Sequence, residues 1–330
     1  MQRTLGQSGP ALNPLGLGCM GLSEFYGEAA PRGEAIALLH QAIELGVQHF
    51  DTAEMYGVGA NEELLGTAFQ DRREKVFIAT KCGIERDRET GAFAGYNGSP
   101  ARIRAAIEGS LKRLRTDHVD LYYLHRKSPQ IPIEESVGAM AELVREGKVR
   151  QLGLSEVSAE TLRKAHAVHP ISALQSEYSL FARQIEGGVL DAVREIGASL
   201  VAYSPLGRGI LTSSFVAEQK DDPKDFRRGD TQPRYSADNL PHNNQLAQVV
   251  RDIARERGVD ASQVALAWVL AQGSDIHAIP GTTKPANLVR NLGAASLSLT
   301  PEELQRLEGL FAQVRGDRYA APMLAVIEAS

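Results

Sequence analysis

Val119-Asp-Leu-Tyr-Tyr-Leu124 is a short apolar run of the kind that forms a β-strand, and Val149-Arg-Gln-Leu-Gly-Leu154 is a second such run. Between them, residues 134–146 carry apolar side chains at helical spacing. A strand, a helix and a further strand in this order are typical of a βαβ unit, in which the two strands run parallel. This stretch therefore predicts a parallel sheet that is covered by helices.

The same alternation continues on both sides of this unit. Further strands are predicted at 15–19, 47–50, 76–80, 171–175, 199–203 and 276–279. Further helices are predicted at 33–46, 60–69, 99–114, 158–168, 187–196, 243–257 and 285–292. Eight such units in roughly 300 residues suit one (β/α)8 TIM barrel, an α/β fold that typically takes about 250 residues plus insertions. We expect a single domain over residues 1–330.

Four segments exceed the minimal strand–helix repeat. We expect 261–271 and 301–314 to form two extra helices that pack outside the ring. The segments 83–98 and 207–241 are polar and glycine-rich, and we expect them to be long loops. Because both follow predicted strands, they should lie at the C-terminal rim of the barrel, where barrel enzymes place their active sites.

The composition limits the class of protein. Of the 330 residues, 43% are hydrophobic, which is enough to bury a sizeable core and excludes disorder as the main state. A formal charge of −5 argues against binding to nucleic acid or to an anionic membrane. No apolar run suits a signal peptide or a membrane span. The two cysteines are too few for a disulfide framework, so we expect reduced thiols in a soluble, cytoplasmic protein.

Residues 16–21 match the dinucleotide fingerprint G-x-G-x-x-G. The fingerprint is meaningful only where a strand leads into a helix, because the helix N-terminus then meets the pyrophosphate. Here Leu22-Ser-Glu-Phe-Tyr-Gly27 follows, and no helix is predicted to begin at Gly21. We therefore interpret these glycines as tight turns at a strand end and not as a Rossmann site.

Polar residues recur just past the ends of three neighbouring predicted strands. Asp51 and Tyr56 follow the second strand, Lys81 ends the third, and His125 ends the fourth. The C-terminal face of a barrel would gather these side chains into one pocket. An ammonium beside a phenol favours the phenolate and lowers the tyrosine pKa, and a carboxylate keeps the ammonium charged. A histidine can orient a carbonyl, so the set suits carbonyl reduction with tyrosine as the proton donor.

Each of these residues also has an ordinary structural interpretation. Asp51 can cap the next turn, Lys81 can be solvated, and Tyr56 can pack at the rim. His125 can be a hydrogen-bonded core histidine. The functional interpretation rests on the order and strand-end placement of all four together.

The chain resembles the aldo-keto reductase superfamily over roughly residues 2–315. The resemblance is carried by Asp51-Thr-Ala-Glu-Met-Tyr56-Gly57, Thr80-Lys81, Asp120-Leu-Tyr-Tyr-Leu-His125, Leu152-Gly-Leu-Ser155, Gln175-Ser-Glu-Tyr178, Ala202-Tyr203-Ser-Pro-Leu-Gly207 and Ile279-Pro-Gly-Thr-Thr-Lys284. It implies that Asp51, Tyr56, Lys81 and His125 are the catalytic tetrad. Leu154-Ser-Glu-Val and Pro205-Leu-Gly-Arg-Gly look most like the plant and microbial branch near perakine reductase.

The same resemblance implies an NADP(H) cofactor. Tyr203 would stack on the nicotinamide, and Ser155 and Gln175 would hydrogen-bond its carboxamide. Most members have asparagine after that serine, whereas this chain has Glu156, which leaves the contact of Glu156 open. The backbone of the next segment would cradle the pyrophosphate, namely Ser204, Pro205, Leu206 and Gly207, continued by Arg208-Gly209.

The segment after the eighth strand suits the 2′-phosphate of NADP(H). It leads into a helix N-terminus and supplies Gly281, Thr283, Lys284, Asn287 and Asn291. No acidic residue lies in 279–291 to repel a phosphate, which favours NADP(H) over NAD(H). The alternative for Lys284 is a solvated surface lysine.

The predicted function is NADPH-dependent reduction of small-molecule aldehydes or ketones. One alternative is a nucleotide-sensing regulatory subunit, because potassium-channel β subunits share this barrel and tetrad. The chain begins close to its first strand, without the N-terminal extension that mammalian forms often carry, which argues against this alternative. Metal-dependent chemistry is disfavoured, since the eight histidines include no H-x-H pair. An apolar substrate pocket is predicted from Phe25, Tyr26, Met55, Phe93 and Tyr96.

Overall fold

The computed structural model describes residues 2–215, 222, 224–227 and 231–328. Its main sheet has eight parallel strands in the order β12-β11-β10-β9-β8-β5-β4-β3. Their bounds are β3 Leu17–Gly18, β4 His49–Asp51, β5 Phe77–Cys82, β8 Val119–Leu124, β9 Val149–Ser155, β10 Ile171–Glu177, β11 Ser199–Tyr203 and β12 Ile276–Ala278. Bridges from Leu15 to Ala278 and from Gly18 to Gly281 join the two edges, so the sheet closes on itself as in a (β/α)8 barrel.

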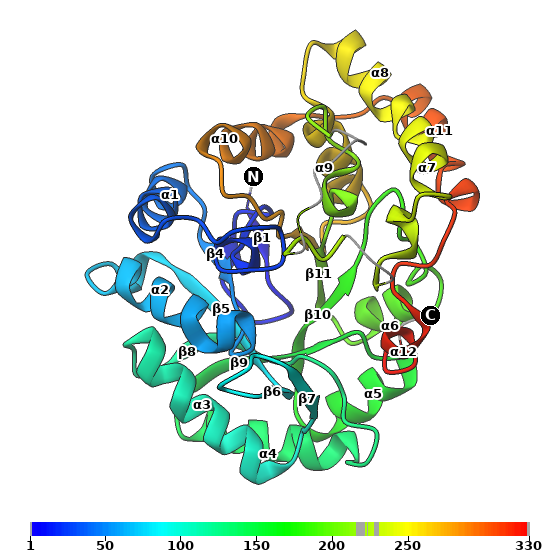
Figure 1. Ribbon diagram of the computed structural model, residues 1–330. Helices are drawn as coiled ribbons and strands as arrows, with labels where there is room; N and C mark the ends of the chain where they lie inside the picture. Colours follow the sequence, from blue (N-terminus) through cyan, green and yellow to red (C-terminus); the bar gives the residue numbers. More distant parts are fainter. Residues whose placement is uncertain (1, 216–221, 223, 228–230, 329–330) are drawn as a thin grey trace.

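Helices surround this sheet (Figure 1). Their bounds are α1 Arg32–Glu44, α2 Ala60–Phe69, α3 Pro100–Leu114, α4 Ile133–Arg145, α5 Ala159–Val168, α6 Val189–Glu195, α7 Leu240–Leu246, α8 Gln248–Arg257, α9 Ala261–Ala271, α10 Pro285–Gly293, α11 Pro301–Glu308 and α12 Ala321–Leu324. Local chemistry sets several of the starts. Ser99 accepts a hydrogen bond from the Arg102 backbone N–H, and Pro100 occupies the first helical position. None of the described helices is long and apolar enough to cross a membrane.

The N-terminal end of the barrel is closed by a hairpin that the sequence did not suggest. Its strands are β1 Arg3–Thr4 and β2 Ala11–Leu12, which pair antiparallel. Leu5 and Leu12 are buried in one cluster with Phe77, Leu121 and Tyr123 from inside the barrel. The interior is therefore packed with side chains at this end, and space for a ligand exists at the opposite rim.

Two of the expected loop and helix assignments need correction. The segment 83–98 is not an irregular loop, because β6 Ile84–Arg86 and β7 Phe93–Tyr96 form an antiparallel hairpin within it. The helix expected at 261–271 has the bounds of α9, yet it contacts β12 and is buried along most of its length. A helix that covers a barrel strand in this way belongs to the ring, whereas we expected it outside.

The remaining differences concern helix boundaries and the seventh loop. The helix expected at 243–257 begins at Leu240 and is divided at Ala247 into α7 and α8. The helix expected at 301–314 ends at Glu308 and is followed by a 3-10 turn. Part of the predicted loop 207–241 lies outside the described residues.

Gly16, Gly18 and Gly21, which match the dinucleotide fingerprint, are not directly followed by an α-helix, as the sequence predicted. β3 is followed by a 3-10 turn at Met20–Leu22, and the first α-helix begins only at Arg32. A Cβ on Gly18 would lie 2.8 Å from the carbonyl oxygen of Ile279. Gly18 is therefore required by close packing where the barrel closes, which supports the interpretation as turns and not as a Rossmann site.

Candidate active site

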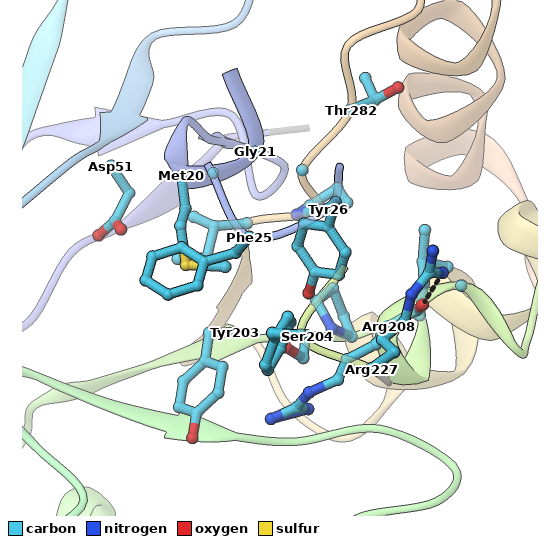
Figure 2. Close-up of a pocket in the computed structure, with 18 of the residues that line it drawn as sticks. Met20, Gly21, Phe25, Tyr26, Asp51, Tyr203, Ser204, Arg208, Arg227 and Thr282 are labelled. Atoms are coloured by element: carbon cyan, nitrogen blue, oxygen red, sulfur yellow. Dashed lines mark hydrogen bonds between the residues drawn. The ribbon is translucent and has the colours of Figure 1, made fainter. Parts of the chain in front are cut away.

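A cavity of about 690 Å³ opens at the C-terminal ends of the strands. Its walls come from segments far apart in the sequence, including Met20, Phe25, Tyr203, Arg227 and Thr282, which border one open space in Figure 2. Cavities of this size at this end of a barrel accommodate small ligands and cofactors.

The four residues predicted to act together do meet at the base of this cavity. Asp51 ends β4, Lys81 lies in β5, His125 follows β8, and Tyr56 begins a 3-10 turn. The Lys81 ammonium donates to a carboxylate oxygen of Asp51, to the carbonyl oxygen of Thr52 at 2.8 Å and to the Tyr56 hydroxyl at 3.4 Å. The rings of Tyr56 and His125 meet edge to face with centroids 5.9 Å apart.

The lysine of this group is a cation held inside the protein. Its side chain is fully buried and pairs with Asp51. Burial by itself lowers the pKa of Lys81, but the attraction of Asp51 and Tyr56 is larger in sum and raises it. Lys81 therefore stays protonated at neutral pH.

The pKa of Tyr56 differs from the sequence-based expectation. We expected Lys81 to lower it below the usual value. Burial raises the pKa of Tyr56 by more than Lys81 lowers it, so the net shift is upward. The expected direction of the Lys81 contribution is right, but the net result is wrong, because sequence does not report how completely the phenol is desolvated. Tyr56 consequently keeps its proton across the neutral range.

His125 is neutral at neutral pH. Burial lowers its pKa well below the usual value, and the positive charges of Lys81 and Arg126 add to this effect. A neutral imidazole has one donor nitrogen and one acceptor nitrogen. His125 is therefore suited to orient a carbonyl oxygen by one hydrogen bond.

Most residues predicted to contact a cofactor line the cavity. These are Ser155, Gln175, Tyr203, Ser204, Pro205, Leu206, Gly281, Thr283, Lys284, Asn287 and Asn291. Gly207 does not line it: its carbonyl oxygen accepts the Tyr235 hydroxyl, and it faces a small neighbouring pocket. Arg208 and Gly209, which follow it, do line the main cavity.

Two of these residues already have partners in the protein. Gln175 donates from its side-chain amide to Asp51 at 2.7 Å, and the Ser155 hydroxyl accepts from Arg126 at 2.9 Å. Gln175 thus connects the cofactor side of the cavity to the Asp51–Lys81 pair. Its amide oxygen is still available to accept a hydrogen bond.

Glu156 does not line the cavity, and its contact is now assigned. Its carboxylate forms a bidentate ion pair with Arg318 at 2.7 and 2.8 Å and accepts the Glu177 backbone N–H at 2.9 Å. Burial raises the pKa of Glu156, but Arg318, Arg126 and the Glu177 N–H together lower it by more, so the carboxylate stays ionised. Glu156, which stands where the resemblance led us to expect asparagine, therefore binds the C-terminal segment to the barrel.

Several cavity residues were not predicted from the sequence. Tyr319 places its hydroxyl 3.1 Å from that of Tyr203, and Met323, Phe226 and Arg290 also line the cavity. They come from the C-terminal segment, the seventh loop and α10. Only for α10 did the sequence mark other positions, Asn287 and Asn291, as facing the site. In contrast, Phe93 was expected in the pocket but is 60% exposed on β7, because the hairpin turns it outward.

The N-terminus of α10 forms the far end of the cavity. Lys284 is the residue before the helix, and its backbone N–H donates to the Thr282 hydroxyl at 3.0 Å. Lys284 and Arg290 are exposed at this end. Among the residues that the structure describes, no group of three or more histidine, cysteine or acidic side chains could hold a metal ion.

Comparisons with known proteins agree with this geometry. The sequence model of the Aldo/keto reductase family matches residues 14–312. The thermostable aldo-keto reductase Tm1743, solved with the inhibitor epalrestat, is 32% identical with a TM-score of 0.75, over 94% of this chain and 99% of that one. Glycerol dehydrogenase AKR11B4 from Gluconobacter oxydans is 29% identical with a TM-score of 0.85, over 96% and 97%.

A third solved structure is an aldo/keto reductase from Klebsiella pneumoniae in complex with NADP and acetate. It is 28% identical with a TM-score of 0.74, over 96% of this chain and 98% of that one. The family model spans most of the sequence, and the solved structures share the whole barrel. The chain therefore belongs to the aldo/keto reductase family.

Proposed function

We propose that this protein reduces aldehydes or ketones to alcohols with NADPH, and that Tyr56 is the proton donor. The observation that carries the proposal is the buried contact of Lys81 with both Asp51 and Tyr56, beside a neutral His125, at the base of a large cavity. A protonated phenol next to a carbonyl-orienting imidazole is the arrangement that carbonyl reduction needs.

The cavity fits a nicotinamide dinucleotide in size and in chemistry. Tyr203 and residues 204–206 line the same cavity as Asp51. The far end has the N-terminus of α10 together with Lys284 and Arg290, and this suits a phosphate monoester. We therefore assign the tetrad end to the nicotinamide and the α10 end to the 2′-phosphate. When bound, the cofactor supplies the hydride.

The residues of this chain would handle the oxygen of the substrate. His125 and Tyr56 would hydrogen-bond the carbonyl oxygen and polarise its bond to carbon. As the carbonyl carbon gains a hydride, the developing alkoxide takes the proton from the Tyr56 hydroxyl, which yields the alcohol. Lys81 stabilises the tyrosinate that is left, and Asp51 keeps Lys81 charged and in place. Solvent then returns a proton to Tyr56.

The relatives support this proposal. One is a glycerol dehydrogenase and another was solved in complex with NADP, and the proposal extends these two properties to this chain. We also place the chain in the branch that resembles perakine reductase, on Leu154-Ser-Glu-Val and Pro205-Leu-Gly-Arg-Gly. A cytoplasmic location is part of the same proposal, since both cysteines are buried and unpaired.

The test is steady-state NADPH oxidation by the purified protein across a panel of aldehydes and ketones, repeated with NADH. We expect carbonyl-dependent NADPH oxidation and a lower kcat/KM with NADH. Fluorescence titration should be run in parallel to measure NADPH binding. Tight NADPH binding without turnover of any carbonyl compound would contradict the proposal and favour a nucleotide-sensing regulatory role.

A further inference from the structure

Arg126 is a cation in the tetrad end of the cavity that forms no direct ion pair with a described residue. It follows His125 directly after β8 and lines the cavity. One of its terminal nitrogens donates to the His125 carbonyl oxygen at 2.7 Å and to the Ser155 hydroxyl at 2.9 Å, which are both neutral acceptors. Within the described part of the chain, no carboxylate lies within 4.0 Å of this guanidinium, and its other two nitrogens have no protein acceptor.

The other cations that line the cavity either form ion pairs or lie at its far end. Arg208 pairs with Glu177 at 3.1 Å, and Arg227 pairs with Asp225. Lys284 and Arg290 lie at the α10 end, which the proposed function assigns to the 2′-phosphate. Arg126 is half-buried, and a partly desolvated guanidinium favours a nearby anion. Burial lowers the pKa of Arg126, but Tyr203 and Glu156, with nearby tyrosines, raise it by more, so Arg126 stays a cation. Glu156 is itself engaged by Arg318, so the nitrogens of Arg126 that face the cavity can donate to an anionic ligand group.

The position of Arg126 relates this preference to the reacting carbonyl. Its positive charge contributes to lowering the pKa of both His125 and Tyr56, so it acts at short range on the two groups that face the carbonyl oxygen. The backbone N–H of His125 donates to the Cys82 carbonyl oxygen at 2.8 Å, which fixes the start of this loop to β5. The guanidinium is thus held beside the reaction site by the barrel itself.

We propose that Arg126 binds a carboxylate on the substrate, so that the preferred substrates are aldehydes or ketones that also carry a carboxylate close to the carbonyl. This inference rests on the proposed function and specifies its substrate class. A single planar guanidinium matches a single carboxylate through two parallel N–H···O bonds. Phe25, Met55 and Met323, which also line the cavity, can cover the apolar atoms between carboxylate and carbonyl.

The experiment compares 4-oxobutanoate with its methyl ester, two aldehydes that differ in the charged group. We expect the wild-type protein to prefer the acid. Arg126→Met should lower kcat/KM for the acid about 10- to 150-fold, as expected for loss of a charge-assisted hydrogen-bonded pair. The ester should lose far less, and Arg126→Lys should retain part of the preference, because it keeps the charge without the planar fork.

Lys127→Met is the matched control. Lys127 is the next residue and also a cation, but its ammonium pairs with Glu328 at 2.9 Å and does not line the cavity. Its loss should leave the ratio of acid to ester unchanged. A second measurement is titration calorimetry with sodium butanoate, whose binding should weaken in Arg126→Met and not in Lys127→Met.

Each outcome separates the two proposals. Equal losses for acid and ester in Arg126→Met, with unchanged butanoate binding, would overturn the carboxylate site and show that Arg126 positions Ser155. Reduction of the ester without preference for the acid would overturn this inference and leave the proposed function standing. Arg126-dependent butanoate binding without turnover of either aldehyde would support the anion site and contradict the reductase activity.

Discussion

At the scale of single residues, the properties of the site depend on titratable side chains whose pKa values are shifted by burial. Lys81 is fully buried, and Tyr56 is 8% exposed. In water, a lysine near a tyrosine would chiefly lower the pKa of the phenol. Here burial dominates and raises that pKa, so Tyr56 keeps its proton at neutral pH, as the proposed role of proton donor requires.

Tyr56→Phe keeps the ring and deletes the proton. General acid catalysis typically contributes about 10²- to 10⁴-fold in rate, and we expect a loss of kcat in this range. NADPH affinity, measured by fluorescence titration, should change little, because the hydroxyl contacts Lys81 and its proposed partner is the substrate and not the cofactor. Single-turnover rates measure the chemical step directly. A single-turnover rate near that of the wild type would show that another group is the acid.

Lys81→Met tests the buried ion pair. Removing one partner leaves Asp51 as a buried carboxylate without its cation, which typically costs about 3–5 kcal/mol. Urea unfolding should show this loss, and reduction at neutral pH should fall as well. Adding Asp51→Asn removes the second charge and should restore part of the stability but none of the activity. Recovery of activity in the double variant would mean that Lys81 acts only through stability.

At the scale of elements, the C-terminal segment, residues 318–328, is held by contacts with residues that lie more than a hundred positions earlier in the sequence. Arg318 reaches Glu156, Tyr319 reaches Tyr203, and the Glu328 backbone N–H donates to the Glu156 carbonyl oxygen at 3.0 Å. One buried carboxylate therefore organises a segment that lines the cavity.

Arg318→Met should loosen this segment. The Glu156 carboxylate would lose its bidentate partner, so we expect faster hydrogen–deuterium exchange at Glu328 and a lower free energy of unfolding. Arg315→Met is the control, because Arg315 is exposed three positions earlier. Unchanged exchange at Glu328 in Arg318→Met would show that the other contacts of the segment, namely the Lys127–Glu328 ion pair and the packing of Ile327, suffice to hold it.

The start of α10 is the element that should decide cofactor choice. Lys284→Glu replaces attraction by repulsion at the proposed 2′-phosphate site. Since Lys284 is exposed, solvent screens the contact, and we expect about a tenfold loss of NADPH affinity, at the lower end for charged hydrogen bonds. NADH affinity should change much less, and added salt should reduce the difference. Equal losses for both cofactors would indicate a general disturbance of the helix start.

At the scale of the whole molecule, closure of the barrel buries histidines as neutral groups. Burial lowers the pKa of His49 to about 3 and that of His277 to about 4, and it lowers the pKa of His125 as well. In the unfolded chain these groups take up protons near pH 6.5. The contribution of these histidines to stability is therefore complete above about pH 6.5 and is lost as the pH falls below it, because the unfolded state binds more protons.

The free energy of unfolding should therefore depend on pH with a measurable slope. Each buried histidine contributes about 1.4 kcal/mol per pH unit in the interval between its two pKa values. Urea unfolding at pH 7, 6 and 5 should show a falling free energy, and His277→Gln should reduce the slope by about one proton. A slope that is the same in both proteins would show that His277 is protonated in the folded state.

The sequence by itself determined the repeating strand–helix order, because hydrophobic periodicity is local and each of the eight strands has its own apolar run. It also determined that Asp51, Tyr56, Lys81 and His125 gather at one end of the barrel, since parallel strands all end at the same rim. Asp51, Tyr56 and His125 line the cavity there, and Lys81 lies buried behind them. The N-terminal hairpin and the turn of Phe93 away from the cavity were not visible, because such short strands carry too few residues for a periodic signal.

Only the tertiary structure decided which charges are paired. Glu156 and Arg318 are 162 positions apart, and Arg126 meets Ser155 on the neighbouring strand while no carboxylate reaches it. The upward shift of the Tyr56 pKa was decided there too. Partner choice and desolvation depend on which atoms the closed barrel brings together and how fully it removes them from water. A sequence pattern specifies neither quantity, because both are sums over contacts between distant segments.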